Sequence, residues 1–411
     1  MEPLDGAAGP EGRPLSAMSI PSRWYIRLAI VFCVVIGLYD VLYVASLALH
    51  GPRLGRPQWV MYPDFLTPWA AVRAFFEGRL AMVYVDIDAF TDFQNALFAD
   101  RFPDIVHYRP FLYPPFWLMV LLPLGLIAVD GAYWVFMLLT VGASAWQQRR
   151  DPWGWLAMAT SPAAVHVVVS GQATFLAVAL AYGGLRLLDK RPALAGILFG
   201  LLGYKPQLCL LFPVALIAAR QWRALAWAAA TGIVLVLASA AVFGVGAWLD
   251  FVELMRATSA ERMHHYVMEV LKAYITTPYV SALAIGLPRG VASSIQLGFT
   301  AIAVATTWYA FRRHRSGAAR TAVLLAGTFF VSPYMLNYDL LLLMPVVIAL
   351  YRRGAAEGFY PLEPLVYAGI WVIPTLTLYL SGHGYPIGPL VILAFLAASL
   401  LRLEDERRSA G

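Results

Sequence analysis

The run LAIVFCVVIGLYDVLYVASLAL, Leu28–Leu49, is long and apolar enough to cross a membrane. Crossing about 30 Å of hydrocarbon takes roughly 20 apolar residues in a helix. Comparable stretches recur along the 411-residue chain as far as Ile387–Leu401, and 60% of the residues are hydrophobic while 13% are charged. The sequence therefore predicts an all-α polytopic membrane protein, because the strands of a membrane barrel would be much shorter and would alternate.

The basic residues, which give the chain a net charge of +6, stand in short clusters between the apolar stretches. This distribution is typical of topology signals in contact with membrane lipids and does not indicate a surface for nucleic acid. The two cysteines, Cys33 and Cys209, lie inside apolar segments, where a thiol behaves as a small hydrophobe. Neither a disulfide framework nor a metal site is expected from them.

The basic clusters also predict a topology, because Lys and Arg accumulate on the cytoplasmic side of membranes. Placing all of them inside gives a helical bundle of about 11–13 transmembrane helices with both termini in the cytoplasm. We expect a disordered tail over 1–22, a single membrane domain over 23–403 and a second tail over 404–411. Residues 51–111 and 247–277 then form two outer loops. The clusters are Arg23/Arg27, Arg149/Arg150, Lys190/Arg191, Arg220/Arg223, Arg312/Arg313/Arg315, Arg352/Arg353 and Arg402/Arg407/Arg408.

Three segments are not expected to form a single transmembrane helix each. Residues 115–128 are apolar but short, which predicts a half-helix, whereas 276–311 is too long for one span and is expected to break at Pro288-Arg289-Gly290. In the first outer loop, the apolar spacing of Phe65 and Val72 predicts a helix lying on the membrane surface.

This topology collects the polar motifs of the apolar segments on the outer side. A transporter or flippase would spread polar groups along a path through the membrane. The one-sided distribution favours an enzyme of the cell membrane with an outer active site over a transporter of a lipid-linked or polar solute, and a non-catalytic assembly subunit stays open as a third class. The motifs are Asp64, Tyr113-Pro114-Pro115, Gly171-Gln172, Lys205-Pro206, His264-His265, Ser332-Pro333-Tyr334 and Asn337-Tyr338-Asp339.

Asp64 is the candidate catalytic residue among the seven acidic residues of the first outer loop. It lies about fifteen residues after the first apolar span, between Pro63 and Phe65, so that partial desolvation is expected to raise its pKa toward that of a general base. The alternative is that Asp64 caps the N-terminus of a helix.

Two cations are candidates for binding an anionic headgroup. Lys205 interrupts a run that is otherwise apolar from Ala193 to Ala219, and a cation inside a membrane protein normally has a partner. That partner is either a carboxylate in a structural ion pair or the phosphate of a lipid substrate. Arg109 either binds such a phosphate or snorkels to the membrane interface.

The remaining polar motifs have two readings each. His264 and His265 either bind a metal or act as an acid, or they belong to a solvent-exposed helix. Adjacent histidines point to different sides of a helix, so a shared metal is not expected. The Gln172 amide and the segment Asn337-Tyr338-Asp339 either bind a polar ligand or hydrogen-bond one helix to another.

The order of Pro63-Asp64-Phe65, Tyr113-Pro114-Pro115, Ser170-Gly171-Gln172 and Lys205-Pro206, the last preceded by Ala195–Gly200, resembles glycosyltransferase family 87 over about residues 60–350. The resemblance implies a GT-C fold and a polyprenyl-phosphate-linked sugar donor. Mannosyltransferases of the family tend to carry a Trp and paired histidines after Ser-Pro, where this chain has Tyr334–Asp339, so the sugar and the acceptor stay open.

By this resemblance we expect inverting transfer of a mannose-like hexose to a lipid or glycan acceptor, without a required cofactor. Asp64 would be the general base, and Lys205 and Arg109 would bind the donor phosphate. No metal site is expected, and a need for a divalent metal stays open. The expected substrate-binding residues are Tyr113, Gln172, His264, His265, Asn337, Tyr338 and Asp339.

Overall fold

The computed structural model describes residues 23–50, 63–99, 109–257, 266–268, 272–313, 317–381 and 383–410. Within these ranges the chain forms α-helices and short 3-10 helices (η), together with one isolated antiparallel bridge and no strand. The predicted all-α fold is therefore confirmed.

The elements α1 to α14 lie before residue 258, and α16 to α21 lie after residue 277. The first elements are α1 (Arg23–His50), α2 (Pro63–Phe76), α3 (Leu80–Val85), α4 (Ile87–Leu97), α5 (Pro115–Leu121), η2 (Leu122–Leu126), α6 (Val129–Gln147), α7 (Pro152–Ala159), α8 (Pro162–Ser170), α9 (Thr174–Leu187), α10 (Pro192–Leu201), η3 (Leu202–Tyr204), α11 (Pro206–Cys209), α12 (Phe212–Ala218), α13 (Trp222–Phe243) and α14 (Gly246–Ala257). They are followed by α16 (Pro278–Ala284), α17 (Arg289–Arg313), α18 (Ala318–Val331), η5 (Asn337–Leu343), α19 (Met344–Glu357), α20 (Glu363–Leu380) and α21 (Gly388–Ala410).

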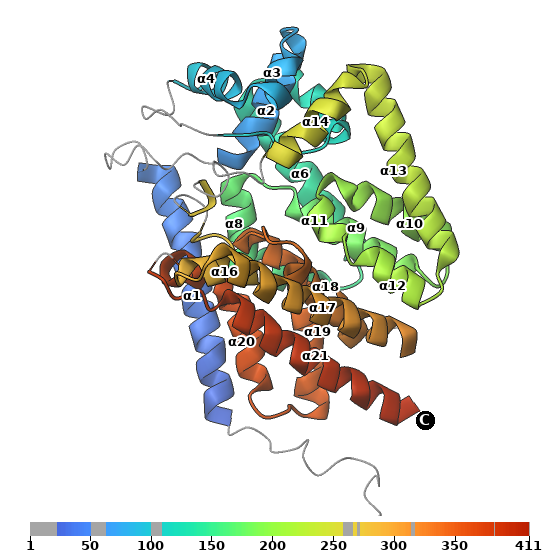
Figure 1. The fold of residues 1–411 in the computed structure, drawn as a ribbon. Coiled ribbons are helices and arrows are strands. Elements are labelled where there is room, and N and C mark those ends of the chain that lie inside the picture. Colours follow the sequence, from blue (N-terminus) through green and yellow to red (C-terminus); the bar gives the residue numbers. More distant parts are fainter. Residues whose placement is uncertain are drawn as a thin grey trace, which may run out of the picture.

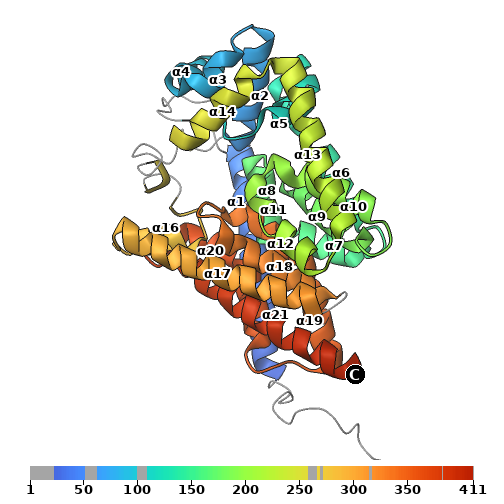
Figure 2. The ribbon, with the colours of Figure 1, turned by 45° about the vertical axis from the view of Figure 1, so that its right-hand side comes forward.

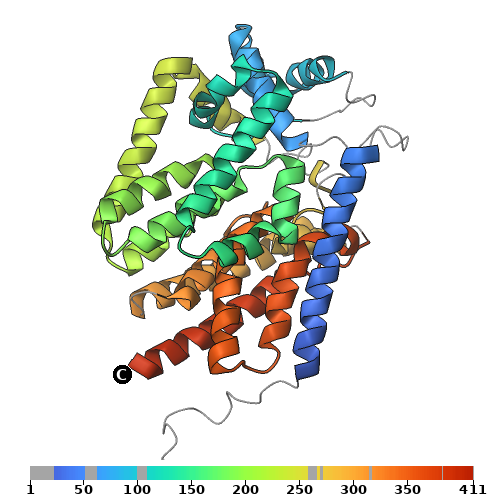
Figure 3. The same ribbon diagram turned by 180° about the vertical axis from the view of Figure 1, so that it is seen from behind.

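The helices form two packed groups that meet along the middle of the molecule (Figures 1 and 2). One group contains α5 to α13, and the other contains α16 to α21, with α1 lying along its side. Helices α2, α3, α4 and α14 gather at the upper end in Figure 1. The start of α1, the turn from α19 to α20 and the end of α21 lie toward the opposite end, as Figure 3 also shows.

Four of the described helices, α1, α13, α17 and α20, contain an apolar stretch long enough to cross a membrane alone. Five further apolar segments are shorter, at 10–17 residues. Proline explains much of this division, because it lacks a backbone N–H and is favoured at the first position of a helix. Pro162 starts α8 with Ser161 as its N-cap, so that the apolar stretch over residues 153–169 is built from two helices, α7 and α8. The number of membrane crossings stays a prediction.

The predictions for the irregular segments agree with the structure in two places and differ in one. Residues 115–126 form the short α5 and η2 before α6, and the chain leaves its helical path at 285–288 between α16 and α17. The surface helix exists as α2, but Phe65 and Val72 are buried in the protein. They pack inward because α2 lies against η2, α5 and α6, and a Cβ on Gly125 would meet Val72 Cγ1 at 2.2 Å.

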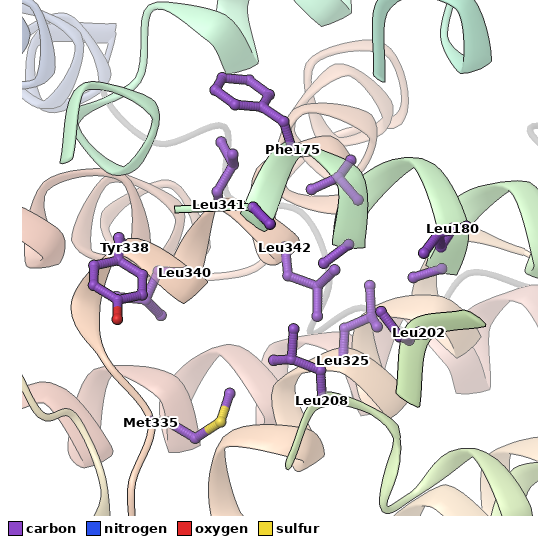
Figure 4. Packing of buried hydrophobic residues seen from close by; sticks show 14 of the residues in the cluster. Phe175, Leu180, Leu202, Leu208, Leu325, Met335, Tyr338, Leu340, Leu341 and Leu342 are labelled. Atoms are coloured by element: carbon purple, nitrogen blue, oxygen red, sulfur yellow. The ribbon is translucent and has the colours of Figure 1, made fainter. Parts of the chain in front are cut away.

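The element at the centre of the molecule is η5, whose seven residues are all buried. Leu340, Leu341 and Leu342 pack among apolar side chains of α9, α11 and α18 (Figure 4). The contacts of η5 with α8, α9, α18 and α20 join the two helix groups. The segment leading into η5 is fixed by residues 274–276, which pair with it through the bridge between Ile275 and Leu336.

Candidate active site

Asp64 lies in the first turn of α2, where the helix dipole favours a negative charge. The helix begins at Pro63, so Asp64 stands inside the first turn and not at the N-cap position that the alternative reading required. Its Oδ2 accepts a hydrogen bond of 2.8 Å from Nε2 of Gln172, and Oε1 of Gln172 accepts one of 3.0 Å from the Tyr113 hydroxyl. Three motifs that are far apart in the sequence therefore form one hydrogen-bonded chain.

Gln172 reaches Asp64 because of the turn that ends α8. Gly171 has a φ of +76° there, the left-handed conformation that glycine adopts without steric cost. Gln172 follows directly and is itself 6% exposed. Glycine at position 171 therefore allows the left-handed turn, and this turn places the Gln172 amide between the Asp64 carboxylate and the Tyr113 hydroxyl.

Burial raises the pKa of the Asp64 carboxyl above its ordinary value, because desolvation disfavours the charged form. The hydrogen bond from Gln172 acts in the opposite direction. The positive charges of Lys205 and Arg109 and the hydroxyl of Tyr338 also lower this pKa, without cancelling the rise. A carboxylate with a raised pKa is a stronger base, and the residue keeps partial exposure to solvent through which a substrate can approach.

Arg109 is positioned by the helices of the first loop. Its backbone N–H donates to Oγ1 of Thr91 over 3.1 Å, and its carbonyl accepts from Nε2 of Gln94 over 2.9 Å. Oε1 of Gln94 in turn accepts from the Thr67 hydroxyl of α2 over 2.8 Å. The buried residues Thr91 and Gln94 therefore tie Arg109 to the helix that carries Asp64. Burial lowers the pKa of the Arg109 guanidinium, and the charge of Asp64 is one of the interactions that raise it.

Lys205 has a carboxylate partner within the protein. Its Nζ lies 2.6 Å from Oδ1 of Asp339, and both side chains are buried, at 3% and 0% exposed. The same Oδ1 accepts a hydrogen bond of 3.1 Å from the Thr174 hydroxyl, whereas Oδ2 of Asp339 has no hydrogen-bond partner among the described residues. The structure thus provides the ion pair that one of the two readings of Lys205 required, and a role toward phosphate stays a prediction.

Tyr338 lies between Asp64 and the ion pair of Lys205 and Asp339. Its ring centroid lies 4.8 Å from Nζ of Lys205, within the range of a cation–π contact, and its hydroxyl is one of the groups that lower the pKa of the Asp64 carboxyl. Asn337 and Asp339, on either side of it, are fully buried. Their contacts within the protein correspond to hydrogen bonding between helices, the second reading of this segment, and their substrate contacts stay predictions.

Two predicted site residues, His264 and His265, lie outside the described residues. The structure brings the other eight together at the ends of α2, α8 and η5, although their catalytic and binding roles are not thereby tested. In the described part of the chain, no group of three or more His, Cys, Asp or Glu side chains is placed to hold a metal ion.

The structure also reveals polar residues that the sequence analysis did not single out. Asp40 on α1 is 4% exposed, and it lies near His166 of α8 and Thr375 of α20. A signal was present in the sequence, because Asp40 is the single charged residue of the apolar run 28–49. A carboxylate in a membrane-spanning helix marks a functional or structural site by default.

Comparison with protein families finds a match between the model of glycosyltransferase family 87 and residues 111–333. This range is slightly more than half of the chain, and it contains Tyr113, Gln172 and Lys205. It is narrower than the expected 60–350, so Asp64, Arg109 and η5 lie outside it. No curated protein and no solved structure matches the chain.

Proposed function

Because this chain belongs to glycosyltransferase family 87 and is a membrane glycosyltransferase, we propose that it transfers a mannose-like hexose from a polyprenyl phosphate to a hydroxyl of a lipid or glycan acceptor. The observation that carries the proposal is the surroundings of Asp64. A desolvated carboxylate with a raised pKa, hydrogen-bonded to Gln172 and near two cations, has the properties that a general base needs beside an anionic donor.

The proposed reaction is a single displacement with inversion. The acceptor oxygen attacks the anomeric carbon while the Asp64 carboxylate takes the hydroxyl proton. The bond from the anomeric carbon to the phosphate oxygen breaks, and its electron pair leaves with the polyprenyl phosphate. Gln172 donates to Oδ2 of the carboxylate, and Oδ1 is proposed to take the acceptor proton.

The leaving group determines what the cations contribute. The phosphate changes from a diester monoanion toward a monoester dianion, so a fixed positive charge binds the transition state more strongly than the ground state. Arg109 is proposed to contact this phosphate directly. Lys205 is proposed to act beside it, with its charge partly balanced by Asp339.

The substrate contacts are proposed to come from Tyr113, Gln172, Tyr338 and the histidines of the second outer loop, His264 and His265. Asn337 and Asp339, which are buried, are proposed to act on the substrate through the position of Tyr338 and the charge of Lys205. With a lipid-linked donor, the proposed reaction uses no nucleotide-binding loop and no required cofactor, and the need for a divalent metal stays open.

The site is proposed to lie at the outer face of the cell membrane, with both termini in the cytoplasm. This is supported by the basic clusters at the start of α1, near the end of α19 and in α21, which lie away from α2, α3 and α4 (Figure 1). Lys and Arg are retained on the cytoplasmic side, so the end with α2 to α4 is assigned to the other side.

The proposal is tested by the choice of donor. The full chain in phospholipid vesicles, supplied with a membrane-lipid extract as acceptor, is expected to form a new glycoside from polyprenyl-phosphate [³H]mannose and none from GDP-[³H]mannose. Label is measured in the glycolipid and polysaccharide fractions. Transfer from the nucleotide sugar would contradict the donor class, and movement of the labelled donor across the vesicle membrane without a new glycoside would favour a flippase.

The pH dependence of transfer is expected to report on Asp64. The carboxylate is the active form, so the rate should fall as the pH drops through the pKa of Asp64, and burial puts this acid limb above the pH at which an exposed aspartate protonates. Gln172→Leu removes a hydrogen bond that lowers this pKa, which moves the limb to higher pH. Initial rates across the pH range check this, with Gln221→Leu, remote from the site, as the control. An acid limb that does not move in Gln172→Leu would contradict the assignment.

A further inference from the structure

A chain of hydrogen-bonding groups runs from Asp40 on α1 to Asn337, the residue that precedes Tyr338. The Thr375 hydroxyl of α20 donates to Oδ2 of Asp40 over 2.5 Å, and it lies 3.3 Å from Nε2 of His166 on α8. Nδ1 of His166 is 3.1 Å from Nδ2 of Asn337. Four elements, α1, α20, α8 and η5, therefore meet through polar side chains inside the helix bundle.

The direction of each hydrogen bond follows from the Asn337 amide. Its Nδ2 faces the carbonyl oxygen of Pro374 at 2.8 Å, and its Oδ1 faces the N–H of the next residue at 2.9 Å, so a reversed amide would oppose like groups at both places. Nδ2 must then donate to Nδ1 of His166, which leaves the ring proton on Nε2. Nε2–H donates to Thr375, and Thr375 donates to Asp40, which ends the chain as an acceptor.

The burial of Asp40 costs folding free energy, so we expect the hydrogen-bond chain to which it belongs to have a function. A carboxylate within a membrane-spanning helix costs free energy unless partners compensate for its burial, and an apolar side chain would have packed α1 against α8 and α20 without that cost. The residues that flank Asp40 on α1, Tyr39 and Val41, are exposed, so the carboxylate alone of these three points into the bundle.

The other end of this hydrogen-bond chain is Asn337, which directly precedes Tyr338 and Asp339 in the sequence. Asn337 is anchored by His166, by Pro374 and by its backbone N–H, which donates to the carbonyl of Tyr274 over 2.7 Å. The Asn337 Oδ1 also accepts from the N–H of Tyr338, so a change in the orientation of this amide is expected to disturb the next two residues. These are Tyr338, whose ring lies 4.8 Å from Nζ of Lys205, and Asp339, which pairs with Lys205.

We infer that Asp40 is a positioning residue, which acts through Thr375 and His166 to hold Tyr338 and Asp339 in place at the active site. The importance of that placement for transfer rests on the proposed function. The hydrogen-bond chain itself does not, so the two can be tested separately.

The first test reads the position of Asp339 without any substrate. The chain contains three lysines, Lys190, Lys205 and Lys272, so NMR of the full chain in lipid nanodiscs with ¹⁵N- and ¹³Cε-labelled lysine gives few signals. Thr375→Val, which removes the hydroxyl at nearly constant volume, is expected to shift the Lys205 resonance, assigned by its loss in Lys205→Met. The other two resonances should not move. A Lys205 resonance unchanged in Thr375→Val would overturn the inference.

The second test separates positioning from stability. Thr375→Val is expected to lower kcat about tenfold with the donor KM within about twofold, because misplacing groups around the reacting atoms lowers the rate more than the binding. Thr375→Ser keeps the hydroxyl and should restore kcat. Thr328→Val is the matched control, since the Thr328 side chain is fully buried and, among the described residues, its hydroxyl bonds only to the carbonyl of Leu324 in its own helix. Wild-type kcat in Thr375→Val, or no restoration in Thr375→Ser, would overturn the inference.

A double variant tests whether Asp40 belongs to the same chain. Asp40→Leu removes the final acceptor, so the loss of kcat in Asp40→Leu/Thr375→Val should not exceed that of the larger single loss. Losses that multiply would show independent effects and contradict a chain from Asp40. Should the wild-type protein transfer no sugar from the lipid donor, the proposed function fails, while the NMR result still decides whether Asp40 and Thr375 hold Asp339.

Discussion

Asp64→Asn should lower the rate of sugar transfer from a polyprenyl phosphate by at least about 10²-fold, because the amide cannot accept the acceptor proton. The amide oxygen can still accept the hydrogen bond from Gln172, which now ends 2.8 Å from Oδ2. The fold around α2 should therefore survive. The raised pKa of Asp64 also shows that its charged form is not stabilised by the fold, so neutralising it should cost little stability.

The measurement is the single-turnover rate in vesicles that contain equal amounts of each variant. Asp92→Asn is the matched control, because Asp92 lies on α4 of the same loop and its side chain is exposed. Asp92→Asn should transfer at the wild-type rate. An Asp64→Asn protein that turns over as fast as the wild type would remove Asp64 from the reaction, and with it the mechanism proposed above.

Lys205→Met should destabilise the protein by about 3–5 kcal/mol, the usual cost of leaving one member of a buried ion pair without its partner. The carboxylate of Asp339 would keep the Thr174 hydroxyl as its hydrogen-bond donor and lose its cation. Lys205→Met/Asp339→Asn should recover most of the stability, because the Asn side chain can still accept from Thr174 and carries no charge.

Unfolding in sodium dodecyl sulfate, followed by tryptophan fluorescence, measures these differences. Arg352→Met is the control, because its pair with Asp151 is about half exposed and such pairs contribute about 1 kcal/mol or less. A loss in Lys205→Met no greater than that in Arg352→Met would contradict the structural importance of the buried pair.

The same double variant separates the two readings of Lys205. If the cation also stabilises the leaving phosphate, Lys205→Met/Asp339→Asn will fold and still transfer slowly. Wild-type transfer by this double variant would show that Lys205 serves the fold alone. Arg109 would then be the one candidate left of the two predicted phosphate-binding residues.

Local sequence signals were enough to predict several features that the structure contains. A helix carries Asp64, as the apolar spacing predicted, and the chain breaks before Arg289, where proline sets the backbone. The Lys205 partner was predicted as one of two possibilities, a carboxylate or a phosphate. Choosing Asp339 required knowledge of which segments are neighbours, since the two residues are 134 positions apart.

Apolar length, composition and charge in the sequence by themselves determined that this is an all-α membrane protein, and ordered motifs indicated its family. These properties are local, because the bilayer requires each crossing segment to be apolar and hydrogen-bonded within itself. Only the tertiary structure decided that α2 packs inward, that Gln172 bridges Asp64 and Tyr113, and that Asp40 reaches η5 through His166. Those contacts join helices from distant parts of the chain, and helix periodicity specifies a face without specifying which helix will cover it.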